Sequence, residues 1–296
     1  MSRSPVVARR RLGAALRELR TAAGLKLEDA ARTLDCSMSK VSRLENGKGV
    51  PRHRDVRDLV ELFGAAARER EDELMRLVAD SLSAGEGLVT DFRDVFEGAV
   101  VSNEVSRYLA LEQDATAISA FEPFLVPGLL QTAEFAEAVV GFFYPERTRG
   151  ERRRLVDLRM QRQEVLRRPG KGRLRFAVVI AEQALRRPIG GPAVMRKQLE
   201  HLAGQLRDGL SEVEFRVAPL DLVHAGVLGG PFAVLRFADE QDQDVVYLEG
   251  RDGATYLETE EQVRRYGETF AALLEACPDR AGSIAIVERA AELISS

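Results

Sequence analysis

The stretch SMSKVSRLENG, residues 37–47, predicts a short helix with a capping residue at each end. Ser37 suits the N-cap, where its hydroxyl can accept a hydrogen bond from a backbone N–H of the first turn. Gly47 suits the other end, because glycine readily adopts the left-handed conformation that stops a helix. Val41 and Leu44 are three residues apart and share one face, which we expect to be buried. The opposite face carries short or hydrogen-bonding side chains: Met38, Ser39, Ser42 and Arg43.

A second short helix is predicted just upstream, and a tight turn joins the two. Only Asp35 and Cys36 separate its last apolar position from Ser37. Two short helices joined in this way form a helix-turn-helix unit, whose second helix can enter the major groove of DNA. The apolar spacing of one helix face occurs three times, so four or five helices should share one core. The positions are Leu12, Ala15, Leu16 and Leu19; Leu27, Ala30, Ala31 and Leu34; and Val56, Leu59, Val60 and Phe63.

Residues 12–64 resemble the Xre family, the lambda-repressor-like DNA-binding domain of the Cro/repressor type. The resemblance rests on LREL followed by Arg at 16–20, AGL at 23–25 and KVSRLENG at 40–47. Two positions depart from the family pattern: Asp35 stands where the turn usually holds glycine, and Leu27 stands near a glutamine that usually binds a phosphate. The resemblance implies two sets of contacts. Met38, Ser39 and Arg43 would contact bases, and Lys40, Ser42, Asn46, Lys48 and Arg52 would contact the DNA backbone.

The charge of the chain is concentrated at its N-terminal end. Residues 1–57 contain fourteen Lys and Arg against six Asp and Glu, a net charge of +8, whereas the whole chain carries −4. A basic region of this kind displaces counterions from DNA. The alternative, a helical bundle whose charged faces are merely solvated, does not account for this asymmetry. We therefore expect double-stranded operator DNA as a partner.

Length and composition limit the remaining possibilities. A chain of 296 residues with 45% hydrophobic content can form two domains, each with its own core. No stretch reaches the ~20 apolar residues of a membrane span, and no signal-peptide pattern opens the chain, so we expect a cytoplasmic, nucleoid-associated protein. Cys36 and Cys277 give no disulfide framework. We expect no catalytic site, no metal and no cofactor, because the three histidines have no ligand-like spacing: His53, His201 and His224.

The sequence divides into two predicted domains with a short linker. An amphipathic helix over 66–82 would either pack on its own N-terminal domain, the default, or pair with its copy in a dimer. The glycine-bearing run SAGEG at 83–87 is the expected linker. The predicted domains are therefore a helix-turn-helix domain over 8–82 and a second domain over 88–296.

The second domain mixes helical and strand patterns, which predicts an α+β fold with an antiparallel sheet. Its last three strand candidates lie close together in the chain and favour an antiparallel meander. The expected helices are 103–113, 131–143, 149–168, 191–209, 261–276 and 283–294. The expected strands are 117–121, 174–180, 213–217, 232–237 and 245–249, with 255–257 as a possible edge.

Several runs in this domain resemble a C-terminal domain of unknown function found in many actinobacterial Xre regulators. They are EPFLVPGLLQT at 122–132, RMQRQ at 159–163, residues 182–191, and the segment from His224 to Phe232. The resemblance implies an antitoxin-like protein, of a kind that often pairs with a small protein encoded by a neighbouring gene. It names no ligand. In the run 122–132, Pro123, Pro127 and Gly128 favour a structured turn into a helix over a binding surface.

Two further features of this domain could suggest a binding site. Gly229-Gly230-Pro231 is not a phosphate loop, because Pro231 lacks an N–H donor and a strand follows instead of a helix. The segment 147–175 has twelve Arg and Lys and three acids, a net +9. Its basic helix could contact DNA beside the operator, an acidic partner protein or the acidic remainder of its own domain, or could simply be solvated.

Taken together, these patterns predict a DNA-binding transcriptional regulator that forms a dimer, with a C-terminal domain that senses a partner protein or a ligand. The alternative is an antitoxin-like or anti-activator protein that acts mainly by binding a small partner protein. An enzyme would need an acid, base or nucleophile in a recognisable arrangement, and the sequence offers none.

Overall fold

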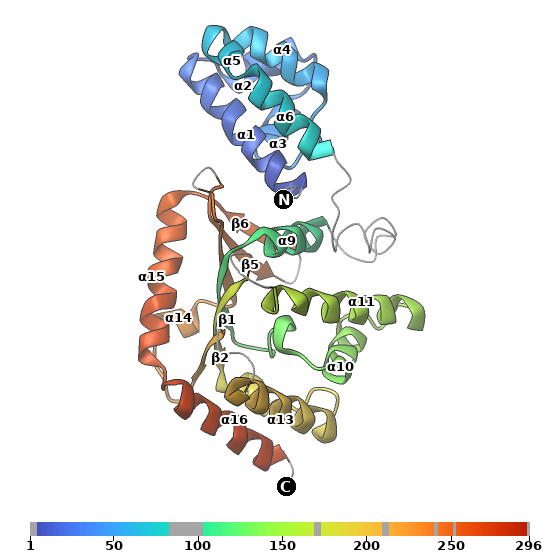
Figure 1. Cartoon of the computed structure of the whole chain (residues 1–296), viewed down its shortest axis with the longest axis vertical. Coiled ribbons are helices and arrows are strands. Elements are labelled where there is room, and N and C mark those ends of the chain that lie inside the picture. The colour runs from blue at the N-terminus through green and yellow to red at the C-terminus, as the bar shows by residue number, and fades with distance from the viewer. Residues whose placement is uncertain are drawn as a thin grey trace. The chain divides into compact units, whose positions relative to one another are not determined.

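A computed structural model describes residues 5–82, 103–168, 173–208, 213–239, 242–250 and 253–294. The chain divides into two compact units (Figure 1). The first contains residues 107–114, residues 239–242 and the helices that precede residue 83, and these helices are called the N-terminal unit below. The second is built around a sheet. The predicted linker, 83–87, lies outside the described residues. None of the helices within the described ranges combines the length and the apolar character that crossing a membrane requires.

The N-terminal unit is entirely helical, as predicted. Its core contains most of the apolar positions identified in the sequence, with Leu12 and Leu16 fully buried. Leu27 and Leu34 are partly buried against this core, and Val41 is fully buried in it. The helices are α1 (Pro5–Ala22), α2 (Leu27–Thr33), α3 (Met38–Glu45), α4 (His53–Phe63), α5 (Ala65–Glu69) and α6 (Glu71–Leu82).

The expectation of one helix over 66–82 is wrong, because the chain turns at Arg70 and begins a new helix. Glu71, Asp72 and Glu73 occupy the first turn of α6, where carboxylates are stabilised by the positive end of the helix dipole. The Arg70 guanidinium lies 2.9 Å from the Glu73 carboxylate, which supports this restart. Helix α6 lies along α1 and buries its apolar side chains in the same core, so it packs on its own domain.

The second unit contains a six-stranded sheet with the order β3-β2-β1-β4-β5-β6. The predicted antiparallel meander is confirmed as β4-β5-β6, and β4 is also antiparallel to β1. Strands β2 and β3, however, run parallel to β1, so the sheet is mixed and mostly antiparallel. The strands are β1 (Ala117–Glu122), β2 (Arg175–Ala181), β3 (Val213–Ala218), β4 (Phe232–Arg236), β5 (Val245–Gly250) and β6 (Gly253–Leu257).

The parallel half of the sheet follows from the helices that connect its strands, since a parallel pair needs a long crossover. All six predicted helices are present with shifted ends. They are α9 (Asn103–Asp114), α10 (Ala133–Phe143), α11 (Arg149–Arg162), α13 (Pro192–Asp208), α15 (Glu260–Ala276) and α16 (Arg280–Ile294). Four short elements were not predicted: the 3-10 turns η1 (Gly128–Leu130) and η2 (Gln163–Leu166), and the helices α12 (Glu182–Arg186) and α14 (Ala225–Leu228).

The two faces of the sheet are covered differently. Figure 1 shows α15 along one side of the sheet and α10 and α11 on the other. On the α15 side, Phe121 and Phe232 of the sheet pack with Phe270 and Leu273 of the helix. The ring centroids of Phe232 and Phe270 lie 6.5 Å apart and the rings are edge to face, which is a favourable aromatic geometry. This core fixes α15 against β1 and β4.

Candidate nucleic-acid interface

Helix α3 has the ends that the sequence predicts. The Ser37 hydroxyl accepts a hydrogen bond from the Lys40 N–H at 3.2 Å, which caps the first turn. Gly47 has a φ of 64°, and its N–H donates to the Leu44 carbonyl at 3.0 Å, which ends the helix. Val41 is fully buried and Leu44 is nearly so. The opposite face of α3 is therefore the one that meets solvent.

The turn before α3 uses a left-handed residue. Of the non-glycine residues that the structure describes, Asp35 alone has a positive φ, 46°. Aspartate tolerates this conformation better than most residues, which explains how it replaces the usual glycine. The Cys36 N–H donates to the Ala31 carbonyl at 2.9 Å and closes the turn. The side chain of Cys36 is half-buried against the core.

A buried ion pair fixes α3 to α1. The Arg20 guanidinium binds the Glu45 carboxylate through two hydrogen bonds, Nε to Oε1 at 2.6 Å and Nη2 to Oε2 at 2.9 Å. Its Nη1 also donates to the Leu25 carbonyl at 2.7 Å. The hydrogen bond to Glu45 raises the pKa of Arg20 above its ordinary value. Both residues belong to runs that carry the family resemblance, yet the sequence alone assigned them no role.

Gly13 allows α1 and α3 to approach closely. A Cβ atom at this position would lie 2.5 Å from the Glu45 carbonyl oxygen and 2.6 Å from that of Leu44. Both atoms belong to the backbone at the end of α3, so neither can rotate away. The bidentate pair and this glycine together set the position of α3 on the domain.

The three residues predicted to contact bases all lie on the outer face of α3. Met38 is 50% exposed, and Ser39 and Arg43 are also exposed. Within residues 5–82, no hydrogen bond or ion pair engages the side chain of Ser39 or Arg43. The Arg43 guanidinium is thus held on a rigid helix and is open to an external hydrogen-bond acceptor.

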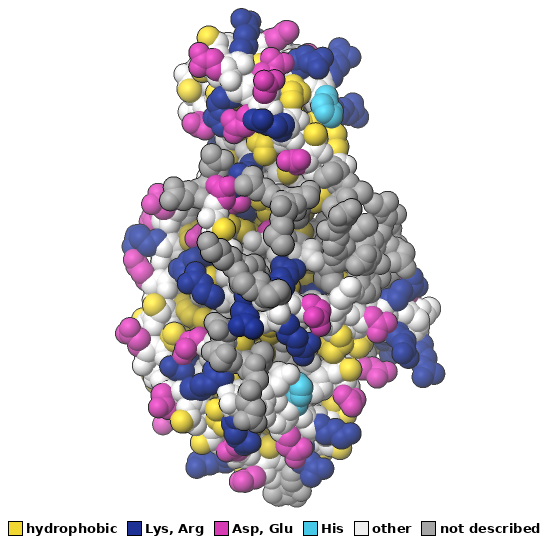
Figure 2. Space-filling view, in the orientation of Figure 1, with side chains coloured by type: hydrophobic (Ala, Val, Ile, Leu, Met, Phe, Trp, Pro, Cys, Tyr) yellow, Lys and Arg dark blue, Asp and Glu magenta, His cyan; other side chains and the backbone are white. Residues whose placement is uncertain are grey.

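The residues predicted to contact the DNA backbone lie on α3 and in the loop after it, but some have partners within the domain. The Lys40 Nζ lies 3.0 Å from Asp55 Oδ2 on α4. The Asn46 side-chain amide donates to the Ser42 carbonyl at 2.8 Å and to its hydroxyl at 3.3 Å. Lys48 and Arg52 are exposed in the loop. Figure 2 shows Lys and Arg side chains interspersed with acidic ones over the visible face of this unit.

In the second unit, three glutamines hold the predicted turn at 122–132. Gln131 donates to the Val126 carbonyl at 2.6 Å, and Gln163 donates to the carbonyls of Gly128 at 3.1 Å and Gln131 at 2.7 Å. Gln198 donates to the Leu130 carbonyl at 2.9 Å and accepts from the Thr132 N–H at 2.7 Å. Two of the runs that resemble the regulator domain, 122–132 and 159–163, therefore come together for a structural reason.

The other two runs also have structural roles. The Gln183 side chain donates to the Pro123 carbonyl at 3.0 Å, which links the segment 182–191 to the turn. His224 caps the short helix α14, because its Nδ1 accepts the Gly226 N–H at 3.0 Å. This contact gives the histidine a structural role.

The inward face of α11 carries charge that sequence reasoning missed. Burial raises the pKa of Glu122 to about 8, and the nearby Glu249 adds to this effect. Burial also lowers the pKa of Arg159 to about 10, with a further contribution from Arg162. Arg159 donates to the Gln131 side-chain oxygen at 3.0 Å. The cations of the segment 147–175 therefore do not all point toward solvent. The spacing indicated this for Arg159, because it lies four residues from the buried Leu155 and so shares its helix face.

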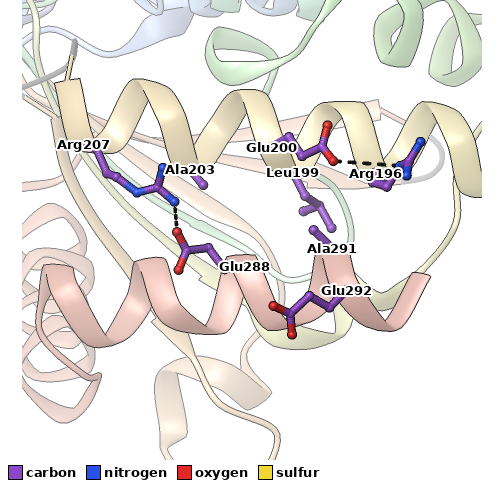
Figure 3. Close-up of a pocket in the computed structure, with 8 residues that line it drawn as sticks. All are labelled: Arg196, Leu199, Glu200, Ala203, Arg207, Glu288, Ala291 and Glu292. Atoms are coloured by element: carbon purple, nitrogen blue, oxygen red, sulfur yellow. Dashed lines mark ion pairs between the residues drawn. The ribbon is translucent and has the colours of Figure 1, made fainter. Parts of the chain in front are cut away.

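An open groove lies between α13 and α16 (Figure 3). Its walls carry the ion pairs Arg196–Glu200, at 3.9 Å, and Arg207–Glu288. Apolar side chains such as Leu199 and Ala291 form its floor. The lining contains no serine, cysteine or histidine, and nowhere in the described ranges do three His, Cys, Asp or Glu side chains gather as a metal site would require. The groove therefore gives no chemical reason for a catalytic role.

Two protein families match the chain, over ranges of the sequence that do not overlap. Residues 11–74 match a helix-turn-helix domain, a class that indicates DNA binding and transcriptional regulation. Residues 105–289 match a family described as a domain of unknown function, DUF5753. No curated protein and no solved structure matches the chain. Because the second match spans more than half of the sequence, the protein belongs to the DUF5753 family, with a helix-turn-helix domain at its N-terminal end.

Proposed function

We propose that the protein is a sequence-specific transcriptional regulator that reads DNA with α3. The observation that carries this proposal is the Arg43 guanidinium, which stands exposed on a helix whose position is fixed by the buried Arg20–Glu45 pair. Arginine is suited to a bidentate contact with guanine, worth about 1–3 kcal/mol of discrimination against other bases. Met38 and Ser39 precede it on the same surface and would contact the neighbouring bases.

The backbone contacts would come from Lys40, Ser42, Asn46, Lys48 and Arg52. Lys40 would have to exchange Asp55 for a phosphate, because the two side chains form an ion pair 3.0 Å apart. Ser42 and Asn46 would bind as a pair, since their mutual hydrogen bonds already orient them. Such contacts set the register of the protein on the duplex and make its affinity fall with salt.

We further propose that two chains act together. In a dimer held by the C-terminal domains, two copies of α3 would lie about 34 Å apart, one helical turn of DNA, on a palindromic operator. A signal received by the C-terminal domain, from a partner protein or a ligand, would then change the spacing or mobility of the two reading helices. A protein with this role works at the chromosome in the cytoplasm.

A second candidate function is an antitoxin-like or anti-activator role in which partner binding is the main output. It is favoured by large apolar side chains on the surface of the second unit, where Val223 is 90% and Leu228 80% exposed. Exposed apolar groups of this size are typical of interaction surfaces when they cluster. The two candidates differ in whether the α3 surface is needed in the cell.

The test of DNA binding is a fluorescence-anisotropy titration against the DNA upstream of the gene and a scrambled duplex, over a salt series. The protein should prefer the upstream DNA. Asp55→Asn should tighten binding to both duplexes alike, because it releases Lys40 and removes an anion. Arg68→Ala, which removes an exposed cation from α5 outside the proposed surface, is the matched control and should change little. Equal, weak binding to both duplexes would contradict sequence-specific recognition.

The test of the second candidate is made in cells. If Ser39→Ala and Arg43→Ala leave the phenotype of the gene unchanged while deletion of 88–296 abolishes it, partner binding is the main activity. If the α3 substitutions and the deletion each abolish the phenotype, the protein is a regulator gated by its C-terminal domain.

A further inference from the structure

The hairpin formed by α10 and α11 carries two exposed aromatic rings at its tip. Phe142 is 78% exposed and Phe143 is 56% exposed, although both are large apolar side chains. The rings contact each other edge to face, with centroids 5.4 Å apart and an interplanar angle of 83°. An aromatic side chain buries 150–250 Å² when it is enclosed, so the pair leaves roughly 250 Å² of ring surface in water.

A basic helix face adjoins this pair. Arg149, Arg152 and Arg153 stand at i, i+3 and i+4 of α11 and therefore share one face. The nearby acids are engaged elsewhere: Glu146 lies 3.6 Å from Arg147, and Glu151 caps the helix through Thr148 and also pairs with Arg147. Within the described residues, no ion pair engages the three arginines of this face.

The aromatic and basic parts are contiguous. Helices α10 and α11 pack together, and the Arg152 Nη1 lies 3.8 Å from where a Cβ on Gly141 would stand. Gly141 directly precedes Phe142, so this guanidinium reaches the last turn of α10, which carries the aromatic pair. The tip of the hairpin, residues 141–143 with the arginine face of α11, thus forms one surface, which we call the Phe-Arg surface.

We propose that the Phe-Arg surface binds an acidic amphipathic helix of a partner protein, with apolar side chains against the two rings and carboxylates against the three arginines. Aromatic residues and arginine are the groups that contribute most to protein interfaces, and opposite charges around an apolar centre give specificity and orientation. This inference rests on the part of the proposed function that gives the C-terminal domain a protein partner. It does not depend on DNA binding by α3.

Other occupants fit this surface less well. A second copy of the chain would bring two sets of three arginines together, and like charges across an interface are costly. Duplex DNA would satisfy the arginines but would leave the two rings without an apolar partner, since phosphate contacts need only cations and polar donors. An anionic membrane would take both groups, although basic and aromatic anchors of this kind usually lie along one helix face rather than across two helices.

The test uses the full-length protein and a fluorescein-labelled peptide of 18 residues, built from Glu and Leu with the leucines on one helix face. A matched peptide of the same composition has its leucines spread around the helix. The protein should bind the first peptide at least tenfold more tightly. Phe142→Ser with Phe143→Ser should weaken this binding at least tenfold. The triple change Arg149→Gln, Arg152→Gln and Arg153→Gln should also weaken it at least tenfold, and this second effect should shrink at high salt.

The matched control is Leu293→Ser, which removes a 54% exposed apolar side chain of α16 that does not belong to the Phe-Arg surface, and the affinity for the first peptide should stay within twofold. The proposal is overturned if the two peptides bind equally, or if the control weakens binding as much as the surface variants. It is also overturned if the surface variants lose affinity for a scrambled duplex or for phosphatidylglycerol vesicles while peptide binding is unchanged. DNA titrations of the same variants separate this failure from failure of the α3 proposal.

Discussion

Gly13→Ala should displace α3, because the space that an added methyl group needs is occupied by the backbone of that helix. The new Cβ would lie 2.5 Å from the Glu45 carbonyl oxygen. Reaching the shortest separation that real Cβ atoms show, 3.0 Å, requires a shift of at least 3.0 − 2.5 = 0.5 Å between α1 and α3. The bidentate Arg20–Glu45 pair spans the same two helices and resists that shift.

The magnitude follows from two opposing effects. Overpacking of a tight contact costs typically 1–3 kcal/mol, and the upper part of this range applies because the clash is with backbone atoms. Alanine in place of glycine within a helix returns about 1 kcal/mol through better helix propensity. The expected net loss is about 1–2 kcal/mol in the free energy of unfolding of the N-terminal unit, equivalent to a factor of about 5–30 in the unfolding equilibrium.

Hydrogen exchange measured by mass spectrometry on the full-length protein gives the local readout, with amides of α3 expected to exchange about 5–30 times faster. The matched control is Gly204→Ala within α13, where nothing lies within 4 Å of the added Cβ. That variant should gain about 0.5–1 kcal/mol. Unchanged or slower exchange of α3 in Gly13→Ala would refute the idea that this glycine sets the position of the reading helix.

Three further changes test individual parts of the structure. Arg20→Met leaves the Glu45 carboxylate, whose side chain is 5% exposed, buried without its partner, and should lower the free energy of unfolding by about 3 kcal/mol. The double change Arg20→Met with Glu45→Met should lower it less. Urea denaturation measures both losses. Asp35→Gly should stabilise the N-terminal unit by about 0.5–1 kcal/mol, because φ there is 46°, whereas Asp35→Val should destabilise it, as thermal melting would show. Burial raises the pKa of Glu122 to about 8 from 4.5, so the folded state keeps a proton that the unfolded state releases; stability should therefore fall as the pH rises from about 4.5 to 8. Glu122→Gln should remove that fall in urea denaturation midpoints, and equal pH dependence in both proteins would show that Glu122 is not the group responsible.

The helix-turn-helix unit was predictable because its determinants are local. The N-cap of α3, its glycine stop and its apolar face all lie within residues 37–47, and capping and periodicity act over one or two turns. The left-handed conformation at Asp35 agrees with the family resemblance, in which the turn usually holds glycine at this position. What the sequence did not reveal is how the unit is braced, because Arg20 and Glu45 are separated by 25 positions and helical periodicity says nothing about which residues pair.

The second unit shows the same limit more strongly. The meander of β4, β5 and β6 was predictable, since its strands are neighbours in the chain. The parallel pairing of β1 with β2 was not, because 52 residues separate Glu122 from Arg175 and strand patterns alone do not fix the direction of pairing. Likewise, net charge left several partners open for the basic segment 147–175, from DNA to its own domain, and did not show that α11 turns Arg159 inward to Gln131. Charge totals describe a segment, and burial is decided by the position of each side chain on the helix.

The most direct test of the central claim is the preference of the protein for upstream DNA over a scrambled duplex, measured by fluorescence anisotropy for the natural chain and for Arg43→Ala. The preference is the dissociation constant for the scrambled duplex divided by that for the upstream DNA. If Arg43 reads a guanine, this ratio should fall by about 5- to 150-fold in the variant, as expected for a loss of 1–3 kcal/mol, while binding to the scrambled duplex weakens only slightly. If Arg43→Ala leaves that ratio unchanged, or weakens binding to both duplexes equally, α3 does not read sequence through this residue and the proposed function fails at its central point.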